Sequence, residues 1–198
     1  MNERWVFMLP NGLIDGEGRL HREVAVASLT GLEEEMLVGK RRVDNTSLVS
    51  LLLSRCVRRA GEISPVPIEA IGGLRKTDRD FLVLKLYAIT FGNIIRETVS
   101  CPQCGEPVDI SFSTEELCQG LLPAGDPEEP GDHMDLETAC PECNHGFDIQ
   151  FDPVTFFLNQ LKAGLTLLYR EVHTLAYHYH WNEPEILALP REKRHMYI

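Results

Sequence analysis

Two short segments of the chain repeat one another at a distance of 39 residues, and each begins with a pair of cysteines. The first is Cys101-Pro-Gln-Cys104 with Val108–Phe112 after it, and the second is Cys140-Pro-Glu-Cys143 with Phe147–Phe151 after it. They share the pattern C-P-x-C-x-x-x-x-D-I-x-F. Two residues between cysteines allow a tight turn to direct both sulfurs at one ion, and two such turns complete a tetrahedron. The repeat therefore predicts a four-cysteine zinc ribbon, with Cys101, Cys104, Cys140 and Cys143 as ligands.

Four protein ligands leave no open coordination position, so the predicted Zn²⁺ is structural rather than catalytic. We expect the strand after each cysteine pair to hydrogen-bond with the strand before the other pair. Metal binding would then close the long insertion between them and contribute free energy to folding. Two alternatives remain for the cysteines: free thiols in loops, and a redox site, because C-P-x-C also occurs in oxidoreductases.

Nothing in the sequence resembles an export signal or a membrane span. Met1–Pro10 lacks a basic region followed by a long apolar run. The best apolar run, Leu48–Leu53, is far shorter than the roughly 18 residues that a span requires. We therefore expect a cytoplasmic protein with reduced thiols, in which metal binding explains the 6 cysteines better than disulfides do.

The charge of the chain argues against phosphate binding. The formal net charge is −11, and the residues beside the cysteine pairs, such as Glu106 and Glu142, are not basic. A zinc-ribbon accessory protein that binds nucleic acid is therefore kept only as the alternative function.

The first half of the chain predicts a β hairpin followed by helices. Alternating apolar residues predict strands at 5–9 and 20–29, with turn residues between them. Thr30 is placed to cap a short acidic helix, and the run Glu33–Glu35 is expected on the solvated surface. Further helices are expected over 44–60, 68–74 and 77–90, and a strand over 94–100 leads into the first cysteine pair.

The second half predicts an exposed loop and then helices. Residues 119–138 are rich in Pro, Gly and acidic side chains, so an acidic loop is expected there. Asp152-Pro153 predicts the start of a long helix reaching at least Leu175, and a second short helix ends at Pro190.

The expected fold class is α+β: mainly helical, with a short N-terminal β hairpin and an inserted four-cysteine zinc ribbon. Three parts are expected: 1–94 (hairpin and helices), 95–152 (zinc ribbon with the loop 119–138) and 153–198 (C-terminal helices packing on the N-terminal part).

Few other residues suggest chemistry. Cys56 and Cys118 are expected to be ordinary buried side chains. His173, His178 and His180 are spaced poorly for a shared metal and are interpreted as an aromatic packing patch. There is no Gly-rich phosphate loop, H-E-x-x-H or G-x-S-x-G motif, and a protein that is not an enzyme is expected.

Several short stretches resemble one family. They are Leu9–Arg22, Leu29–Glu35, Leu51–Arg55, Asp80–Tyr87 and Tyr177–Pro190. Leu29–Glu35 is similar to an LTG-x-EE region of phage tail and baseplate assembly proteins, and Tyr177–Pro190 is similar to the end of small tail-assembly proteins. Together they resemble the chaperone-like baseplate hub assembly family of T-even-type phages, also found in extracellular contractile injection systems. The zinc ribbon is an insertion relative to its shortest members.

The resemblance implies a non-enzymatic structural or assembly component of a contractile phage tail-like particle. Its partners would be baseplate, hub or tape-measure proteins, and whether it stays in the finished particle is left open. Under this hypothesis Leu161 and Leu165 are core residues, whereas Trp181, Ile186 and Leu187 contact a partner.

Overall fold

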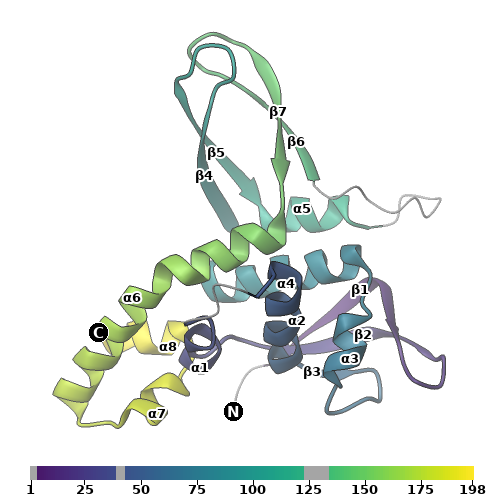
Figure 1. Cartoon of the computed structure of the whole chain (residues 1–198), viewed down its shortest axis with the longest axis vertical. Helices are drawn as coiled ribbons and strands as arrows, with labels where there is room; N and C mark the ends of the chain where they lie inside the picture. The colour runs from purple at the N-terminus through teal and green to yellow at the C-terminus, as the bar shows by residue number, and fades with distance from the viewer. Residues whose placement is uncertain (1–3, 39–42, 123–133) are drawn as a thin grey trace.

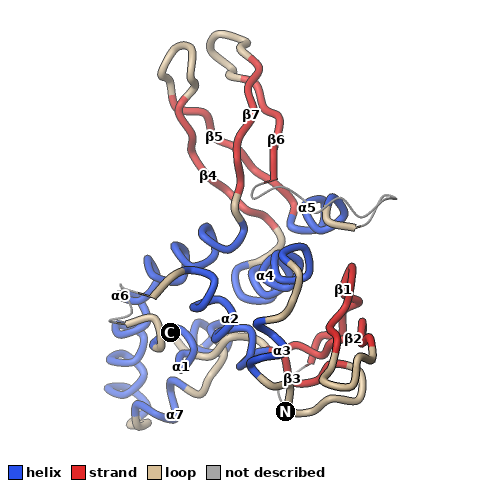
Figure 2. Tube along the Cα trace, turned by 45° about the vertical axis from the view of Figure 1, so that its right-hand side comes forward, coloured by secondary structure: helices blue, strands red, loops and turns tan. Residues whose placement is uncertain are grey.

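The computed structural model describes residues 4–38, 43–122 and 134–198. It shows a body of helices and one three-stranded sheet, from which two β hairpins project side by side (Figures 1 and 2). Helices and short antiparallel sheets thus occur together in one mixed fold. In the described ranges, no helix has both the length and the apolar character needed to cross a bilayer.

The N-terminal hairpin is confirmed. Strands β1 (Arg4–Ile14) and β2 (Leu20–Ala27) pair antiparallel, with Trp5 opposite Val26. The register shifts between Met8 and Leu13, where the chain bulges. The carboxylate of Asp78, in the first turn of α4 (Lys76–Phe91), accepts hydrogen bonds from the backbone N–H groups of Asn11 (2.8 Å) and Gly12 (3.2 Å). These two N–H groups lie in the bulge, where the strand ladder is interrupted, so Asp78 provides their hydrogen-bond acceptor.

One expected helix is shorter than predicted. Helix α2 (Asn45–Cys56) begins at its Asp44 cap as expected but ends four residues early, and β3 (Val57–Ala60) follows it. Val57 and Ala60 are buried where β3 pairs with β2. The expectation of a helix to Ala60 was wrong, because hydrogen bonding to the sheet outweighs the weak local helix preference.

Helices α1 (Gly31–Glu35), α3 (Ile68–Gly72) and α4 (Lys76–Phe91) lie close to the expected positions. Helix α5 (Thr114–Gly120) was not expected. The Glu33 carboxylate accepts hydrogen bonds from the N–H (2.9 Å) and hydroxyl (2.6 Å) of Thr30, as in a capping arrangement. The main core lies between the sheet and helices α2 and α4.

The C-terminal part is built on one long helix, α6 (Pro153–Tyr179). Its first half packs in the main core, and its second half packs against the short helix α7 (Glu183–Leu187). Helix α8 (Arg191–Met196) follows, where only a basic tail was expected. The chain returns close to α1 here: a Cβ added at Gly31 would lie 2.8 Å from Leu187 Cδ2.

A buried ionic cluster joins α1, α6 and α8. The Arg194 side chain is 0 % exposed and donates to Glu34 Oε1 (2.6 Å), to Glu171 Oε2 (2.8 Å) and to the Leu189 carbonyl (2.8 Å). Arg191 lies 3.3 Å from the second oxygen of Glu34. The acidic run was expected on the surface, but Glu33 and Glu34 are buried. The correction has a physical reason: both carboxylates have hydrogen-bonding partners that remove the penalty of burial.

The expected loop 119–138 is only partly a loop. Residues 119 and 120 close α5, and Met134 begins strand β6 (Met134–Ala139). Residues 123–133 of the expected loop lie outside the described residues.

Replacing Arg194 with Ala should destabilise the protein by about 3–5 kcal/mol, because it leaves two buried carboxylates without their partner. Urea unfolding measured by circular dichroism would report the loss. Lys193→Ala is the control: this neighbouring side chain is exposed, so a change within about 0.5 kcal/mol is expected. Equal unfolding midpoints for the two variants would contradict a stabilising role for the cluster.

Candidate metal centre

The four predicted cysteines lie at the tips of the two projecting hairpins, which we call the arm (residues 94–113 and 134–151). The first hairpin consists of β4 (Ile94–Ser100) and β5 (Pro107–Ser113), and the second of β6 and β7 (Gly146–Phe151). Each cysteine pair therefore sits in the turn of its own hairpin (Figure 1).

This pairing differs from the prediction, in which the strands were exchanged between the two cysteine pairs. Instead β4 pairs with β5, bringing Ser100 opposite Pro107, and β6 pairs with β7. The cysteine turn itself begins each ladder, since the N–H of Cys101 donates to the Glu106 carbonyl at 2.9 Å and that of Cys140 donates to the His145 carbonyl at 2.9 Å. Closing a short turn costs less chain entropy than pairing across the whole insertion.

The two turns have the same backbone geometry. The N–H of Gly105 donates to the Cys101 carbonyl, and the N–H of Asn144 donates to the Cys140 carbonyl, each at 2.9 Å. Both residues directly follow the second cysteine of a pair and have left-handed φ angles, 77° for Gly105 and 55° for Asn144. Glycine and asparagine adopt this conformation most readily. Neither position was among the predicted site residues, although glycine or asparagine directly after the second cysteine is a signal for the turn.

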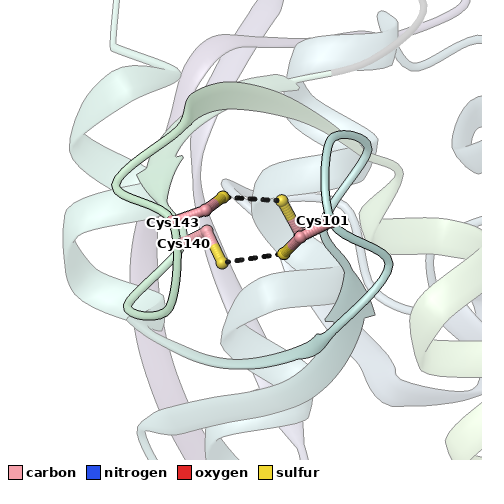
Figure 3. Close-up of side chains that lie close together, drawn as sticks. Cys101, Cys140 and Cys143 are labelled. Atoms are coloured by element: carbon pink, nitrogen blue, oxygen red, sulfur yellow. Dashed lines mark hydrogen bonds between the residues drawn. The ribbon is translucent and has the colours of Figure 1, made fainter.

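The sulfur positions fit a tetrahedral metal ion. All four Sγ atoms lie within 4.8 Å of one another. Across the hairpins, Cys101 Sγ lies 3.7 Å from Cys143 Sγ, and Cys104 Sγ lies 3.6 Å from Cys140 Sγ (Figure 3). A zinc ion with four sulfur ligands at about 2.3 Å would place them about 3.8 Å apart. The donor set and spacing are therefore compatible with zinc, and the sequence prediction that these four side chains meet is confirmed.

The residues repeated after each cysteine pair explain how the hairpins face one another. Cys101 and Cys140 are buried, and a small apolar cluster includes Ile110 and Ile149, the isoleucines of the two repeats. The repeated aspartates, Asp109 and Asp148, are exposed. Alternation along each strand thus directs apolar side chains towards the other hairpin and carboxylates towards solvent.

Hydrogen bonds and neighbouring sulfurs shift the cysteine pKa values in opposite directions. The pKa of Cys101 falls to about 6, chiefly because the Cys104 N–H donates to its sulfur and the Gln103 N–H also does so. The Glu106 N–H lowers the pKa of Cys104, but burial and the adjacent sulfurs outweigh it and raise the value to about 12. Because its pKa is raised, Cys104 keeps its proton at neutral pH without a cation, and a bound metal would displace that proton.

Other cysteines and histidines do not join this group. Cys56 and Cys118 are buried as expected, and burial raises the pKa of Cys118 to about 11. His145 stacks on Phe147 with ring centroids 6.3 Å apart, and His173 stacks on Tyr177. In the ranges that the structure describes, the four cysteines form the one group of His, Cys, Asp and Glu residues able to hold a metal.

A family model described as the T4 bacteriophage base plate protein matches residues 21–129, which is 109 of the 198 residues. The chain belongs to this baseplate protein family. The match begins in β2 and includes the first cysteine pair, but it ends before the second pair at Cys140 and Cys143. No curated protein and no solved structure matches the chain.

The three predicted partner residues of this baseplate protein differ in how far they are buried. Ile186 and Leu187 are 0 % and 3 % exposed and lie in a core cluster with Leu168 and Leu175. Their predicted contact with a partner needs correction, because both side chains already pack inside the chain. Trp181 is only partly buried, and its ring lies near other aromatic rings of the C-terminal part.

The core expectation for Leu161 and Leu165 agrees with the packing. Leu161 is fully buried in the main core, and Leu165 is partly buried between the main core and the α6–α7 cluster.

Replacing Cys140 with Ser should abolish stoichiometric zinc binding, because a neutral hydroxyl is a poor substitute for a thiolate ligand. Zinc measured by mass spectrometry of the purified protein should fall from about one ion per chain to none. Cys118→Ala, which removes a buried thiol outside the group, should keep its zinc. Equal zinc contents in Cys140→Ser and the wild type would rule out this metal centre.

Proposed function

We propose that this chain is a non-catalytic structural or assembly component of a contractile phage tail-like particle, acting in the hub of the baseplate as an assembly chaperone. The observation that carries the proposal is the family match over residues 21–129. The resemblance of Leu29–Glu35 and Tyr177–Pro190 to tail-assembly proteins supports the hub role more specifically. The expected partners are baseplate, hub or tape-measure proteins.

The proposed cofactor is one structural Zn²⁺ held by the four cysteines, which would make the arm a zinc ribbon. An isolated two-stranded hairpin is only marginally stable in water. Near their tips, the two hairpins of the arm share a small apolar cluster beside the four sulfurs, and no backbone ladder joins one hairpin to the other in the described residues. A metal ion that bonds to both hairpins would therefore supply much of the free energy that holds them together.

An aromatic surface at the other end of the molecule is the proposed partner contact. Trp181 lies 5.2 Å from the ring of Tyr179 and 5.1 Å from that of Tyr197. Tyr179 and Tyr197 are exposed, as is Met196 beside them. Tyrosine, tryptophan and methionine are enriched in protein interfaces, so this group suits protein binding.

The location follows from the proposed role. Synthesis and assembly would take place in the cytoplasm, and the chain would then join the tail-like particle or leave it after assembly.

The test is metal content together with native mass, measured on the purified protein alone and mixed with the tail-hub proteins encoded beside it. One zinc per chain and a stable complex would support a zinc-stapled assembly component. Zinc without any complex would favour the nucleic-acid alternative, and absence of zinc would exclude the proposed cofactor.

Trp181→Ala should weaken the complex with the hub proteins by about tenfold or more while leaving zinc content unchanged, because aromatic anchors contribute strongly to interfaces. Ile186→Asp should instead unfold the C-terminal part, since it buries a charge in the core. Titration of the complex and thermal unfolding separate the two effects. A Trp181→Ala protein that binds like the wild type would remove this surface from the proposal.

A further inference from the structure

Two contacts between sulfur atoms cross from one hairpin of the arm to the other. Cys101 Sγ lies 3.7 Å from Cys143 Sγ, and Cys104 Sγ lies 3.6 Å from Cys140 Sγ. Figure 3 draws both contacts as dashed lines between the two cysteine turns. Each sulfur takes part in one of the two contacts, so two bonds formed along them would use all four sulfurs.

Each of these pairs combines a cysteine that solvent reaches with a cysteine that is buried. Cys104 is exposed and its neighbour Cys140 is 1 % exposed, whereas Cys143 is half-buried and its neighbour Cys101 is 2 % exposed. An oxidant attacks the accessible sulfur of such a pair, and the neighbouring cysteine then resolves the product into a disulfide. Both cross-hairpin pairs therefore have one cysteine for each step.

The hairpins are free to close over the short distance that a disulfide requires. A disulfide bond is about 2.05 Å long, so the sulfurs of each pair must approach by about 1.6 Å. No backbone ladder joins β4 or β5 to β6 or β7 within the described residues. Each turn, by contrast, is held by its own hydrogen bonds, such as that from the Gly105 N–H to the Cys101 carbonyl at 2.9 Å. Moving one tip towards the other thus disturbs less structure than bonding two sulfurs within one turn.

We propose that the four cysteines are a site of oxidation by peroxide, at which Cys101 bonds to Cys143 and Cys104 bonds to Cys140 while zinc is released. The two disulfides would join the hairpins at the same place as the proposed metal. The inference rests on the proposed function for its setting, because a component that stays in a finished tail-like particle passes from a reducing cytoplasm to an oxidising medium. The arm would then stay closed where thiolates do not persist.

Each disulfide consumes one molecule of hydrogen peroxide. The O–O bond breaks as the first thiolate becomes a sulfenic acid, and one hydroxide leaves. The second thiolate attacks that sulfur, which forms the S–S bond and expels the second hydroxide. Two thiolates thus lose two electrons, and the two oxygens of the peroxide gain them. Four zinc-bound thiolates and two peroxides give two disulfides, four hydroxides and one Zn²⁺.

The test treats the full-length, zinc-loaded chain with hydrogen peroxide, follows zinc release with a colour indicator and maps the disulfides by mass spectrometry. Cleavage after Glu142 separates Cys140 from Cys143, and fragmentation of the linked peptides distinguishes Cys101 from Cys104. About two peroxides should be consumed for each zinc ion released, and both bonds should cross between the hairpins. The buried Cys56 and Cys118 should remain thiols and serve as the internal control.

Two double variants provide the matched comparison. Cys104→Ser with Cys140→Ser keeps the cross-hairpin pair, whereas Cys101→Ser with Cys104→Ser keeps the two cysteines of one turn. Both retain two arm cysteines and both lack the four-ligand set, so zinc binding does not distinguish them. Peroxide should form the disulfide of the first variant at least about tenfold faster than that of the second.

Several outcomes overturn the inference. They are disulfides within the turns, disulfides between two chains, oxidation to sulfinic or sulfonic acid without a disulfide, and equal rates for the two double variants. Each of them leaves the proposed assembly function standing, because the complex with the hub proteins is measured separately. If the predicted disulfides form but no hub complex does, the assembly function fails and the cysteine chemistry stands without its setting.

Discussion

The packing of α6 holds the other parts of the molecule in place. Its first half lies in the main core beside α2 and α4, and its second half forms a separate cluster with α7. The helix begins immediately after β7, so its first turn also fixes the base of the arm. Phe151, the last residue of β7, is buried between Phe112 of the first hairpin, at 6.4 Å, and Phe156 of α6, at 5.4 Å. The hairpins therefore contact each other through aromatic packing at the base, and their four cysteine sulfurs lie together at the tip.

Charge is used in two different ways in this baseplate protein. Glu34, Glu171 and Arg194 are buried, and their hydrogen bonds fix α8 against α1 and α6. Such a cluster is costly to break once formed, although well-packed apolar residues of similar volume would be about as stable. On the arm, by contrast, the carboxylates of Asp135, Glu137 and Asp148 are exposed to solvent.

The chain belongs to a baseplate protein family, which bears on the interpretation of its exposed surface and of its cysteine site. A protein of a multi-component particle needs surfaces for its neighbours, and the proposed surface here is the aromatic group around Trp181. The family match ends before the second cysteine pair, so it covers only half of the proposed metal site. The local repeat nevertheless gives both halves the same turn geometry, and each half supplies two of the four sulfurs.

Local sequence determined the features that depend on neighbouring residues. The spacing of the cysteines defined both turns, Thr30, Asp44 and Asp152 marked helix starts, and the alternation after each cysteine pair set which side chains face inwards. Tertiary structure decided the rest. Whether 57–60 continued a helix depended on hydrogen bonds to β2. Whether Glu34 faced solvent depended on α8, which is distant in sequence, and whether Ile186 did depended on how α7 folds back against α6. The partners of the cysteine hairpins were also decided at this level, because local turn closure and pairing across the insertion satisfy the same backbone groups, and the shorter closure costs less entropy.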